Sequence, residues 1–138
     1  MEPKNKHVLI IDNDETTRRL FGSLLSTAGY EVIYAKDGEI GRETARRLQP
    51  DLILMDESMP GWDGLETSNI LKKEPQTTNI PIILFTNADL SIEAVKWMKE
   101  IGVMDYIQKG VSNDEFIIRI NKIFEKLENT SSPKEKVE

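Results

Sequence analysis

Hydrophobic residues along the chain form short continuous runs that alternate with longer amphipathic segments. Residues 8–11, 52–55 and 80–85 are apolar at successive positions rather than at every second one. That pattern is typical of strands buried on both faces, as in a parallel sheet covered by helices. Two weaker runs, residues 30–35 and 103–107, complete the predicted strands, and the first alternates enough to lie at a sheet edge.

Helical periodicity fills the segments between these runs. The first predicted helix ends at Gly29 and has one apolar face, which consists of Leu20, Phe21, Leu24, Leu25 and Ala28. Three further helices are expected over residues 38–48, 64–74 and 91–101. A last helix begins with a capping box from Ser112 to Glu115 and carries one apolar stripe. Strands and helices in strict alternation predict an α/β fold with helices on both faces of a parallel sheet.

Length and C-terminal composition predict one domain followed by a tail. A chain of 138 residues falls within the range of a single domain. All predicted elements lie within residues 1–127. Residues 128–138 offer no apolar face to bury, so we expect a disordered polar tail there.

Composition excludes several classes of function. Cysteine is absent, which removes thiol catalysis and thiolate metal sites. The single histidine, His7, leaves no room for a multi-histidine metal cage, and its place before a strand predicts a structural or solvent-facing role. The net charge of -6 disfavours nucleic-acid binding. No apolar run approaches the roughly 20 residues of a membrane-spanning helix, so we expect a cytoplasmic protein without membrane contact.

Polar side chains follow four of the predicted strands at the points where they end. In an open parallel sheet, the carboxyl ends of the strands share one edge, so residues far apart in sequence meet there. The residues at these exits are Asp12, Asn13 and Asp14; Asp56, Glu57 and Ser58; Thr86 and Asn87; and Gln108 and Lys109. Carboxylates, a hydroxyl and an ammonium are therefore predicted to converge on one edge.

Each of these residues also has an ordinary structural interpretation. Asp14 is a good N-cap for the first helix, and this role stands beside a metal-binding role. Thr86 taken alone is typical of a cap or turn, and Lys109 of a solvated lysine. Asp56 directly follows an apolar strand and has no capping duty, which favours a chemical role.

One alternative is a phosphatase of the haloacid-dehalogenase type, in which Asp12 is the nucleophile. Asp12, Asp14, Thr86 and Lys109 fit the first three motifs of such an enzyme in order. The fourth motif fails, because no apolar strand precedes the acidic residues after Lys109. The strongest acidic strand exit, Asp56, comes before Thr86 instead.

The ordered motifs resemble the receiver domain of bacterial two-component response regulators, of the single-domain chemotaxis type. The segments VLIIDNDE, PDLILMDESMPGWDG, IPIILFTNA and GVMDYIQKG carry the resemblance over about residues 6–127. The resemblance implies a flavodoxin-like (βα)5 fold, a doubly wound five-stranded parallel sheet with strand order 2-1-3-4-5. Residues 1–127 would then be a receiver domain.

The resemblance also implies a role for each strand-exit residue. Asp56 would accept a phosphoryl group from a histidine kinase or a histidine phosphotransfer protein, assisted by Thr86 and Lys109. A Mg²⁺ or Mn²⁺ cofactor would be held by Asp12, Asn13, Asp56 and the backbone carbonyl of Ser58. Such a protein is a signalling phosphoacceptor that assists only its own phosphorylation and dephosphorylation, and is otherwise no enzyme.

By the same resemblance, Thr86 and Tyr106 would form the switch. The switch would alter a face made by the fourth helix, the fifth strand and the fifth helix, to which a downstream effector protein binds. Trp97 is a candidate contact on that face, and Trp62 is expected at the rim of the phosphorylation pocket. We expect a monomer or weak homodimer. No output domain follows the last predicted helix, so the chain would act by docking or be a fragment of a longer regulator.

One departure from the family pattern weakens the metal site. Asn13 stands where the family normally has the second aspartate of its acidic pair. An amide oxygen can coordinate Mg²⁺ but brings no charge, so weaker metal binding is predicted. This departure favours a rival interpretation, a pseudo-receiver that binds proteins without phosphorylation. Intact Asp56, Thr86 and Lys109 argue against that rival.

Overall fold

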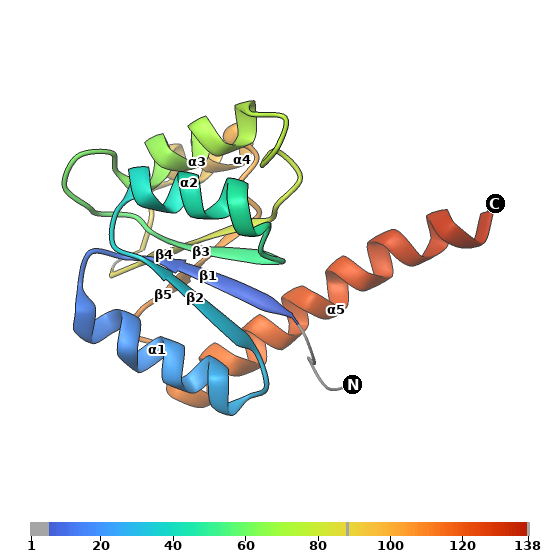
Figure 1. Cartoon of the computed structure of the whole chain (residues 1–138), viewed down its shortest axis with the longest axis horizontal. Coiled ribbons are helices and arrows are strands. Elements are labelled where there is room, and N and C mark those ends of the chain that lie inside the picture. Colours follow the sequence, from blue (N-terminus) through green and yellow to red (C-terminus); the bar gives the residue numbers. More distant parts are fainter. Residues whose placement is uncertain (1–5, 88, 138) are drawn as a thin grey trace.

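Strands and helices alternate along the whole described chain (Figure 1). The structure, a computed structural model, describes residues 6–87 and 89–137. The strands are β1 (His7–Ile11), β2 (Glu31–Ala35), β3 (Leu52–Asp56), β4 (Ile82–Thr86) and β5 (Asp105–Gln108). The helices are α1 (Glu15–Thr27), α2 (Gly38–Leu48), α3 (Gly64–Lys73), α4 (Ile92–Ile101) and α5 (Asn113–Val137).

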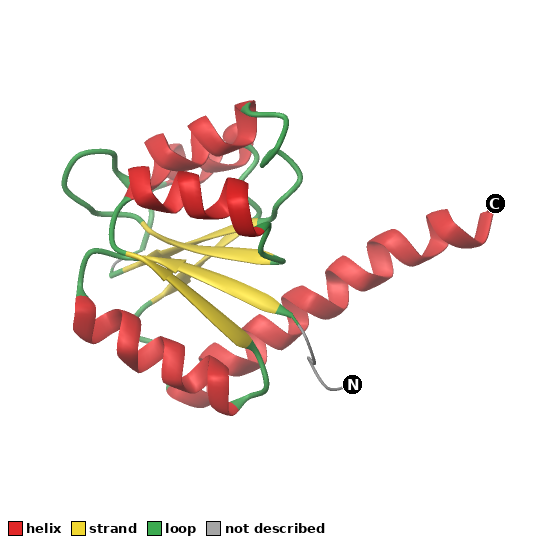
Figure 2. Cartoon of the chain, viewed as in Figure 1, coloured by secondary structure: helices red, strands yellow, loops and turns green. Residues whose placement is uncertain are grey.

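The five strands form one parallel sheet in the order β2-β1-β3-β4-β5. Helices α1 and α5 cover one face, and α2, α3 and α4 cover the other (Figure 2). The fold is therefore the doubly wound, flavodoxin-like arrangement that the sequence predicts. The first crossover leaves β1 toward β2 and the second returns to place β3 on the other side of β1, so the switch point lies between β1 and β3.

The core consists of two apolar clusters, one on each face of the sheet. Successive residues of β1 alternate between them: Val8 and Ile10 contribute to the cluster under α1 and α5, and Leu9 and Ile11 to the one under α2, α3 and α4. Both faces of the central strands are buried from solvent, which explains their continuous apolar runs. Burial on both sides also fixes the register, because a shift by one residue would exchange the two faces.

Two strands begin later than the apolar pattern predicts. β4 was expected from residue 80 and starts at Ile82, because Ile80 closes a turn on the carbonyl of Thr77 and Pro81 has no N–H for the ladder. β5 was expected over residues 103–107 and spans Asp105–Gln108. Val103 instead donates its N–H to Met98 at the end of α4, so it is buried as part of the helix terminus.

The last helix runs beyond the end of the predicted domain. α5 continues as helix to Val137 and projects away from the sheet (Figure 1); residue 138 lies outside the described residues, and the disordered polar tail over residues 128–138 stays a prediction. The apolar stripe packs the first part of α5 against the core and nucleates the helix. Beyond Leu127 the helix continues through a mainly polar sequence, because propagation from a packed first part costs much less than nucleation.

Candidate functional site

The carboxyl edge of the sheet brings together two carboxylates and one ammonium. Asp12 directly follows β1, Asp56 is the last residue of β3, and Lys109 directly follows β5. Lys109 Nζ lies 2.9 Å from Asp56 Oδ1 and 3.0 Å from Asp12 Oδ2. Both carboxylates are buried, with relative exposures of 1% and 4%. The three residues therefore form one acid–amine–acid cluster, as the strand exits predict.

The floor of this cluster is aromatic. Phe85 lies beside Asp56 in the register of β3 and β4, and Lys109 Nζ is 5.5 Å from the centre of its ring. Phe21 and Phe116 pack edge-on or tilted against Phe85 from α1 and α5. The cluster is thus closed from below by apolar groups, and its charges interact through a medium of low polarity.

Burial and pairing shift the ionisation of these groups. Burial raises the pKa of Asp56, and the neighbouring Asp12 carboxylate adds to the rise, while the hydrogen bond from Lys109 opposes it. Burial by itself lowers the pKa of Lys109, but its bonds to Asp56 and Asp12 outweigh this, so its pKa is raised. Lys109 therefore remains an ammonium at neutral pH and compensates the adjacent acids.

Asp12 and Asp14 have different duties although they stand two residues apart. Asp12 Oδ1 accepts a hydrogen bond of 2.9 Å from the N–H of Asp14, which turns the chain after β1. Asp14 caps α1, because its carboxylate accepts from the Thr17 N–H at 3.0 Å and the Thr17 hydroxyl at 2.6 Å. The hydrogen bond from the Thr17 hydroxyl is the main cause of the lowered pKa of Asp14. Of the two roles considered for Asp14, the structure contains the cap.

Thr86 reaches the site from the end of β4. Its side chain is buried, and its hydroxyl donates to Glu57 Oε1 at 3.3 Å. The Thr86 carbonyl accepts from the Lys109 N–H at 2.7 Å, which ties the ends of β4 and β5 together. The sequence pattern predicted no specific role for Glu57. Its place directly after Asp56, among the strand-exit acids, was the signal that could have indicated one.

A close approach of glycine shapes the loop after β3. A Cβ on Gly64 would lie 2.3 Å from the Asp56 carbonyl oxygen, so only glycine fits there without a backbone shift. The Gly64 N–H donates to the Glu57 carbonyl at 3.0 Å and closes the loop. Within the loop, the Ser58 N–H points at Asp56 Oδ1 at 3.5 Å. The backbone of this loop thus passes close to the Asp56 carboxylate.

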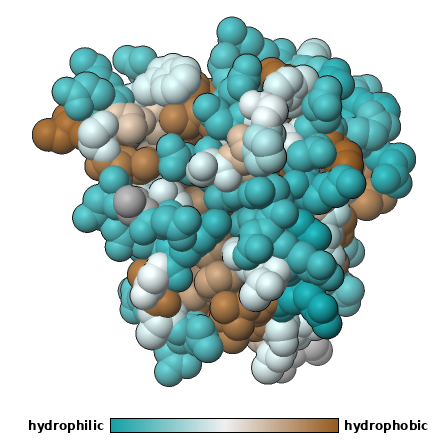
Figure 3. Space-filling model, turned by 90° about the vertical axis from the view of Figure 1, so that its left-hand side faces the viewer, coloured by the Kyte–Doolittle hydropathy of each residue, from teal (hydrophilic) through white to brown (hydrophobic). Residues whose placement is uncertain are grey.

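Next to the acid–amine–acid cluster lies an open cavity of about 690 Å³ at the same edge of the molecule. It is lined by Asn13, Lys36, Asp37, Gly38, Glu39, Pro60, Gly61 and Trp62. Figure 3 looks onto this side of the molecule, where hydrophilic residues predominate and hydrophobic ones form scattered patches. Trp62 therefore lies at the rim of the site, as expected, and Asn13 is exposed to the cavity rather than buried with Asp12.

The oxygen atoms of this cluster fit part of what a hard divalent cation requires. Asp12 Oδ2 is buried and accepts no well-aligned hydrogen bond, although Lys109 contacts it as an ion pair. An oxygen in that state is suited to a cation such as Mg²⁺. In the part of the chain that the structure describes, no three His, Cys, Asp or Glu side chains gather closely enough to form a metal site on their own. Asn13, which follows Asp12, supplies an amide rather than a carboxylate at this edge.

His7 lies at the opposite end of β1 from this cluster. Its backbone N–H donates to Asp51 Oδ2 at 2.7 Å, and its imidazole Nδ1 lies 3.8 Å from the same oxygen. The side chain is half exposed. His7 is therefore a structural and solvent-facing residue, as predicted.

Comparison with known proteins identifies the family and the fold. A family model described as "Response regulator receiver domain" matches residues 8–121. The chain belongs to this family. The family assignment rules out the phosphatase alternative and explains why the acidic strand exit at Asp56 precedes Thr86 in the sequence.

Individual relatives of this receiver domain agree with the assignment. Protein PilH of Pseudomonas aeruginosa is 34% identical over 116 residues, which cover 84% of this chain and 95% of PilH. The polar-differentiation response regulator DivK of Brucella anthropi is 34% identical over 112 residues, or 81% of this chain and 90% of DivK. Other relatives are longer: the receiver domain matches 51% of the transcriptional regulator PhoB of P. aeruginosa.

Solved structures share the architecture of the receiver domain. The chemotaxis protein CheY4 of Vibrio cholerae superposes with a TM-score of 0.79 at 26% identity, covering 85% of this chain and 97% of CheY4. A putative response regulator from Chloroflexus aurantiacus gives a TM-score of 0.78 at 32% identity, covering 87% and 98% of the two chains. Within residues 6–87 and 89–137 of the receiver domain, no helix has the length and hydropathy needed to cross a membrane.

Proposed function

We propose that this receiver domain accepts a phosphoryl group on Asp56 from a histidine kinase or a histidine phosphotransfer protein. The observation that carries the proposal is the position of Lys109, whose ammonium lies within 3.0 Å of carboxylates from two different strands. Asp56 attacks the phosphorus with a carboxylate oxygen, the bond from phosphorus to the donor breaks, and the donor group leaves with the electron pair. Lys109 offsets the negative charge that gathers as the two anions approach.

A divalent cation, Mg²⁺ or Mn²⁺, completes the proposed site. Asp12, Asn13, Asp56 and the Ser58 carbonyl would hold it through oxygen atoms, with water in the remaining positions. When bound, the cation offsets charge on the carboxylates and the phosphoryl oxygens. Since Asn13 is neutral and exposed, we expect this receiver domain to bind Mg²⁺ more weakly than one with an aspartate at this position.

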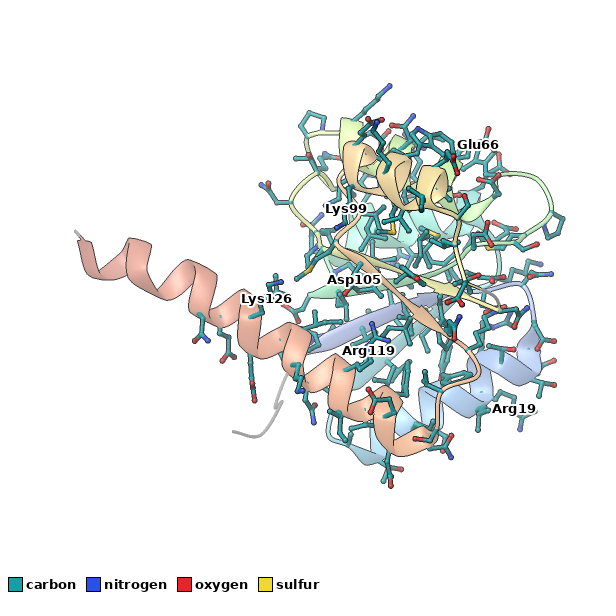
Figure 4. All side chains as sticks on the ribbon, turned by 180° about the vertical axis from the view of Figure 1, so that it is seen from behind. Arg19, Glu66, Lys99, Asp105, Arg119 and Lys126 are labelled. Atoms are coloured by element: carbon teal, nitrogen blue, oxygen red, sulfur yellow. The ribbon has the colours of Figure 1, made fainter. Side chains whose placement is uncertain are left out.

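Phosphorylation then changes the partner-binding face. The proposed switch residues are Thr86, which hydrogen-bonds the phosphoryl group, and Tyr106, which packs inward behind it. The face that changes is made by α4, β5 and α5; Figure 4 shows it with Lys99 on α4, Asp105 on β5 and Arg119 on α5. Arg119 donates to the Tyr106 carbonyl at 3.0 Å, so α5 is connected to the switch strand.

The proposed partners follow from this scheme. They are a phosphodonor protein at the carboxyl edge of the sheet and an effector protein on the α4–β5–α5 face. Trp97, which is 49% exposed on α4, is the candidate aromatic contact for the effector. A cytoplasmic location, a monomer or weak homodimer, and the absence of nucleic-acid and membrane partners remain predictions from composition.

Intact mass after incubation with acetyl phosphate and Mg²⁺ tests the proposal. We expect one added phosphoryl group on the wild type and none on Asp56→Asn, which keeps the shape of the side chain but removes its nucleophilic charge. Glu66→Gln is the matched control, because Glu66 is an exposed acid on α3 outside the cluster (Figure 4). An adduct that persists in Asp56→Asn contradicts the assignment of Asp56.

A pseudo-receiver is the second candidate, and Asn13 is the observation that favours it. Under this alternative the fold binds a partner without phosphorylation, and Lys109 only neutralises two buried acids. The same mass experiment separates the two functions when it is repeated with Mg²⁺ and with Mn²⁺. No adduct with either ion supports the pseudo-receiver, whereas an Asn13→Asp variant that speeds phosphorylation supports the phosphoacceptor.

A further inference from the structure

Glu57 contacts the switch residue from a position that the proposed chemistry does not use. Its carboxylate oxygen Oε1 accepts a hydrogen bond of 3.3 Å from the Thr86 hydroxyl. A threonine hydroxyl has one proton to donate, so Thr86 cannot donate to Glu57 and to a phosphoryl oxygen at the same time. We propose that Glu57 is a positioning residue that holds Thr86 in the unphosphorylated arrangement and competes with a phosphoryl group on Asp56 for this proton. The inference rests on the proposed function.

The backbone around Glu57 holds its side chain next to β4. The Glu57 N–H donates to the Phe85 carbonyl at 3.2 Å, and the Glu57 carbonyl accepts from Gly64 at 3.0 Å. Both backbone groups of Glu57 are therefore bonded, and its side chain starts from a backbone that is tied to the end of β4. From there the Glu57 carboxylate reaches the Thr86 hydroxyl.

The backbone of Thr86 is held in the same way. Thr86 is the last residue of β4, is paired with Gln108 of β5, and accepts from the Lys109 N–H at 2.7 Å. A change of partner by the hydroxyl is thus a rotation of the side chain about χ1, with β4 in place. Because Thr86 is only 3% exposed, water does not readily replace Glu57, and the hydroxyl exchanges one protein-bound acceptor for another.

Removal of the acceptor has a defined consequence. Without Glu57, the Thr86 hydroxyl loses the partner that competes with the phosphoryl group, and the phosphorylated arrangement becomes easier to reach. One intramolecular hydrogen bond changes such an equilibrium by about threefold to tenfold. Glu57 also carries negative charge near an anionic ligand, so the experiment must separate hydrogen bonding from charge.

The test uses the full chain and beryllofluoride, a phosphoryl mimic, in the presence of Mg²⁺. Its apparent dissociation constant is measured by tryptophan fluorescence for Glu57→Gln and Glu57→Ala. Glutamine removes the charge but keeps a carbonyl oxygen that accepts from Thr86, and alanine removes both. We expect Glu57→Ala to bind beryllofluoride about threefold to tenfold more tightly than Glu57→Gln. Glu57→Leu repeats the removal with a longer apolar side chain in case the alanine variant is poorly folded.

Equal affinities of the glutamine and alanine variants overturn the inference, because the effect would then come from charge alone. Glu66→Ala, which removes an exposed charge on α3, is expected to match the wild type. Failure of the wild type to take up a phosphoryl group from acetyl phosphate overturns the proposed function and this inference together. Phosphorylation of the wild type with equal affinities of the two variants overturns this inference alone.

Discussion

At the scale of single residues, the site depends on a charge balance that no member provides alone. Asp12 and Asp56 are like charges in a buried cleft, and the Lys109 ammonium contacts both of them. Removal of one partner from a buried ion cluster leaves the others uncompensated, which costs more than the loss of an exposed pair. We therefore expect Lys109 to stabilise the unphosphorylated domain in addition to its proposed role in phosphoryl transfer.

Lys109→Met makes this dependence measurable. In the presence of EDTA at pH 7, we expect the variant to lose about 2 to 4 kcal/mol of unfolding free energy. The pKa of Asp56 is already raised by burial and rises further without the ammonium. The folded variant therefore binds a proton more tightly than the unfolded chain, so its deficit shrinks as the pH falls.

Urea denaturation at pH 7 and pH 5 measures both effects. Lys99→Met is the matched control, because Lys99 is exposed on α4 and its loss should change stability by less than about 0.5 kcal/mol. A deficit of Lys109→Met that grows toward pH 5 contradicts the explanation.

At the scale of elements, Tyr30 connects α5 to the edge of the sheet. Tyr30, just before β2, stacks on Phe124 with ring centres 5.2 Å apart, and its hydroxyl donates to Asn121 Oδ1. Burial is the main cause that raises the pKa of Tyr30 from 10.0 to about 12. Ionisation of this hydroxyl would place a charge between α5 and the sheet.

The raised pKa predicts a specific loss of stability at high pH. The contribution of Tyr30 is fully present below pH 10 and is lost as the pH rises through about 12. As the pH rises between these limits, the unfolding free energy of the wild type should fall by on the order of 2 kcal/mol more than that of Tyr30→Phe, because phenylalanine cannot ionise. At pH 8, Tyr30→Phe should cost about 1 kcal/mol through the lost hydrogen bond to Asn121.

Chemical denaturation at pH 8, 10 and 11.5 tests this dependence on pH. Tyr34→Phe serves as the control, since Tyr34 is 48% exposed on β2. Parallel pH profiles for the wild type and Tyr30→Phe would show that Tyr30 is not the responsible group.

At the scale of the whole molecule, the carboxyl edge of the sheet and the protruding part of α5 lie at opposite ends of the domain (Figure 1). Among the side chains that the structure describes, the core clusters include α5 residues up to Leu127. We expect the last turns of α5 to add little to the stability of the domain, since an isolated helical segment of this length is marginal in water.

A chain that ends at Asn129 is expected to keep the fold and the site. Its thermal unfolding midpoint should agree with that of the full chain to within about 2 °C, because no described core contact is removed. Circular dichroism measures the midpoint, and intact mass after acetyl phosphate treatment measures the site. A drop of the midpoint by about 5 °C or more would show that the protruding helix packs on the domain. A chain that ends at Ile120 is the contrasting control, because it removes Ile123 and Phe124 from the core.

Local patterns in the sequence were sufficient for the elements and for much of the site. Five apolar runs predicted the five strands, and Asp37 and Ser112 cap their helices by bonds of 2.8 and 3.0 Å to Ile40 and Glu115. These features depend on neighbours along the chain, so periodicity and capping chemistry report them directly. The convergence of strand-exit residues followed from the parallel sheet alone.

Other features were decided only when the chain folded. The sequence allowed Asp14 a capping role beside a metal-binding role, and the folded first turn of α1 contains the cap. The bond from Thr86 to Glu57 joins residues 29 positions apart and depends on the path of the loop that Gly64 closes. The sequence by itself therefore determined which chemical groups reach the edge of the sheet. The tertiary structure decided which of them touch, because hydrogen bonds are sensitive to distances of a few tenths of an ångström that no local pattern specifies.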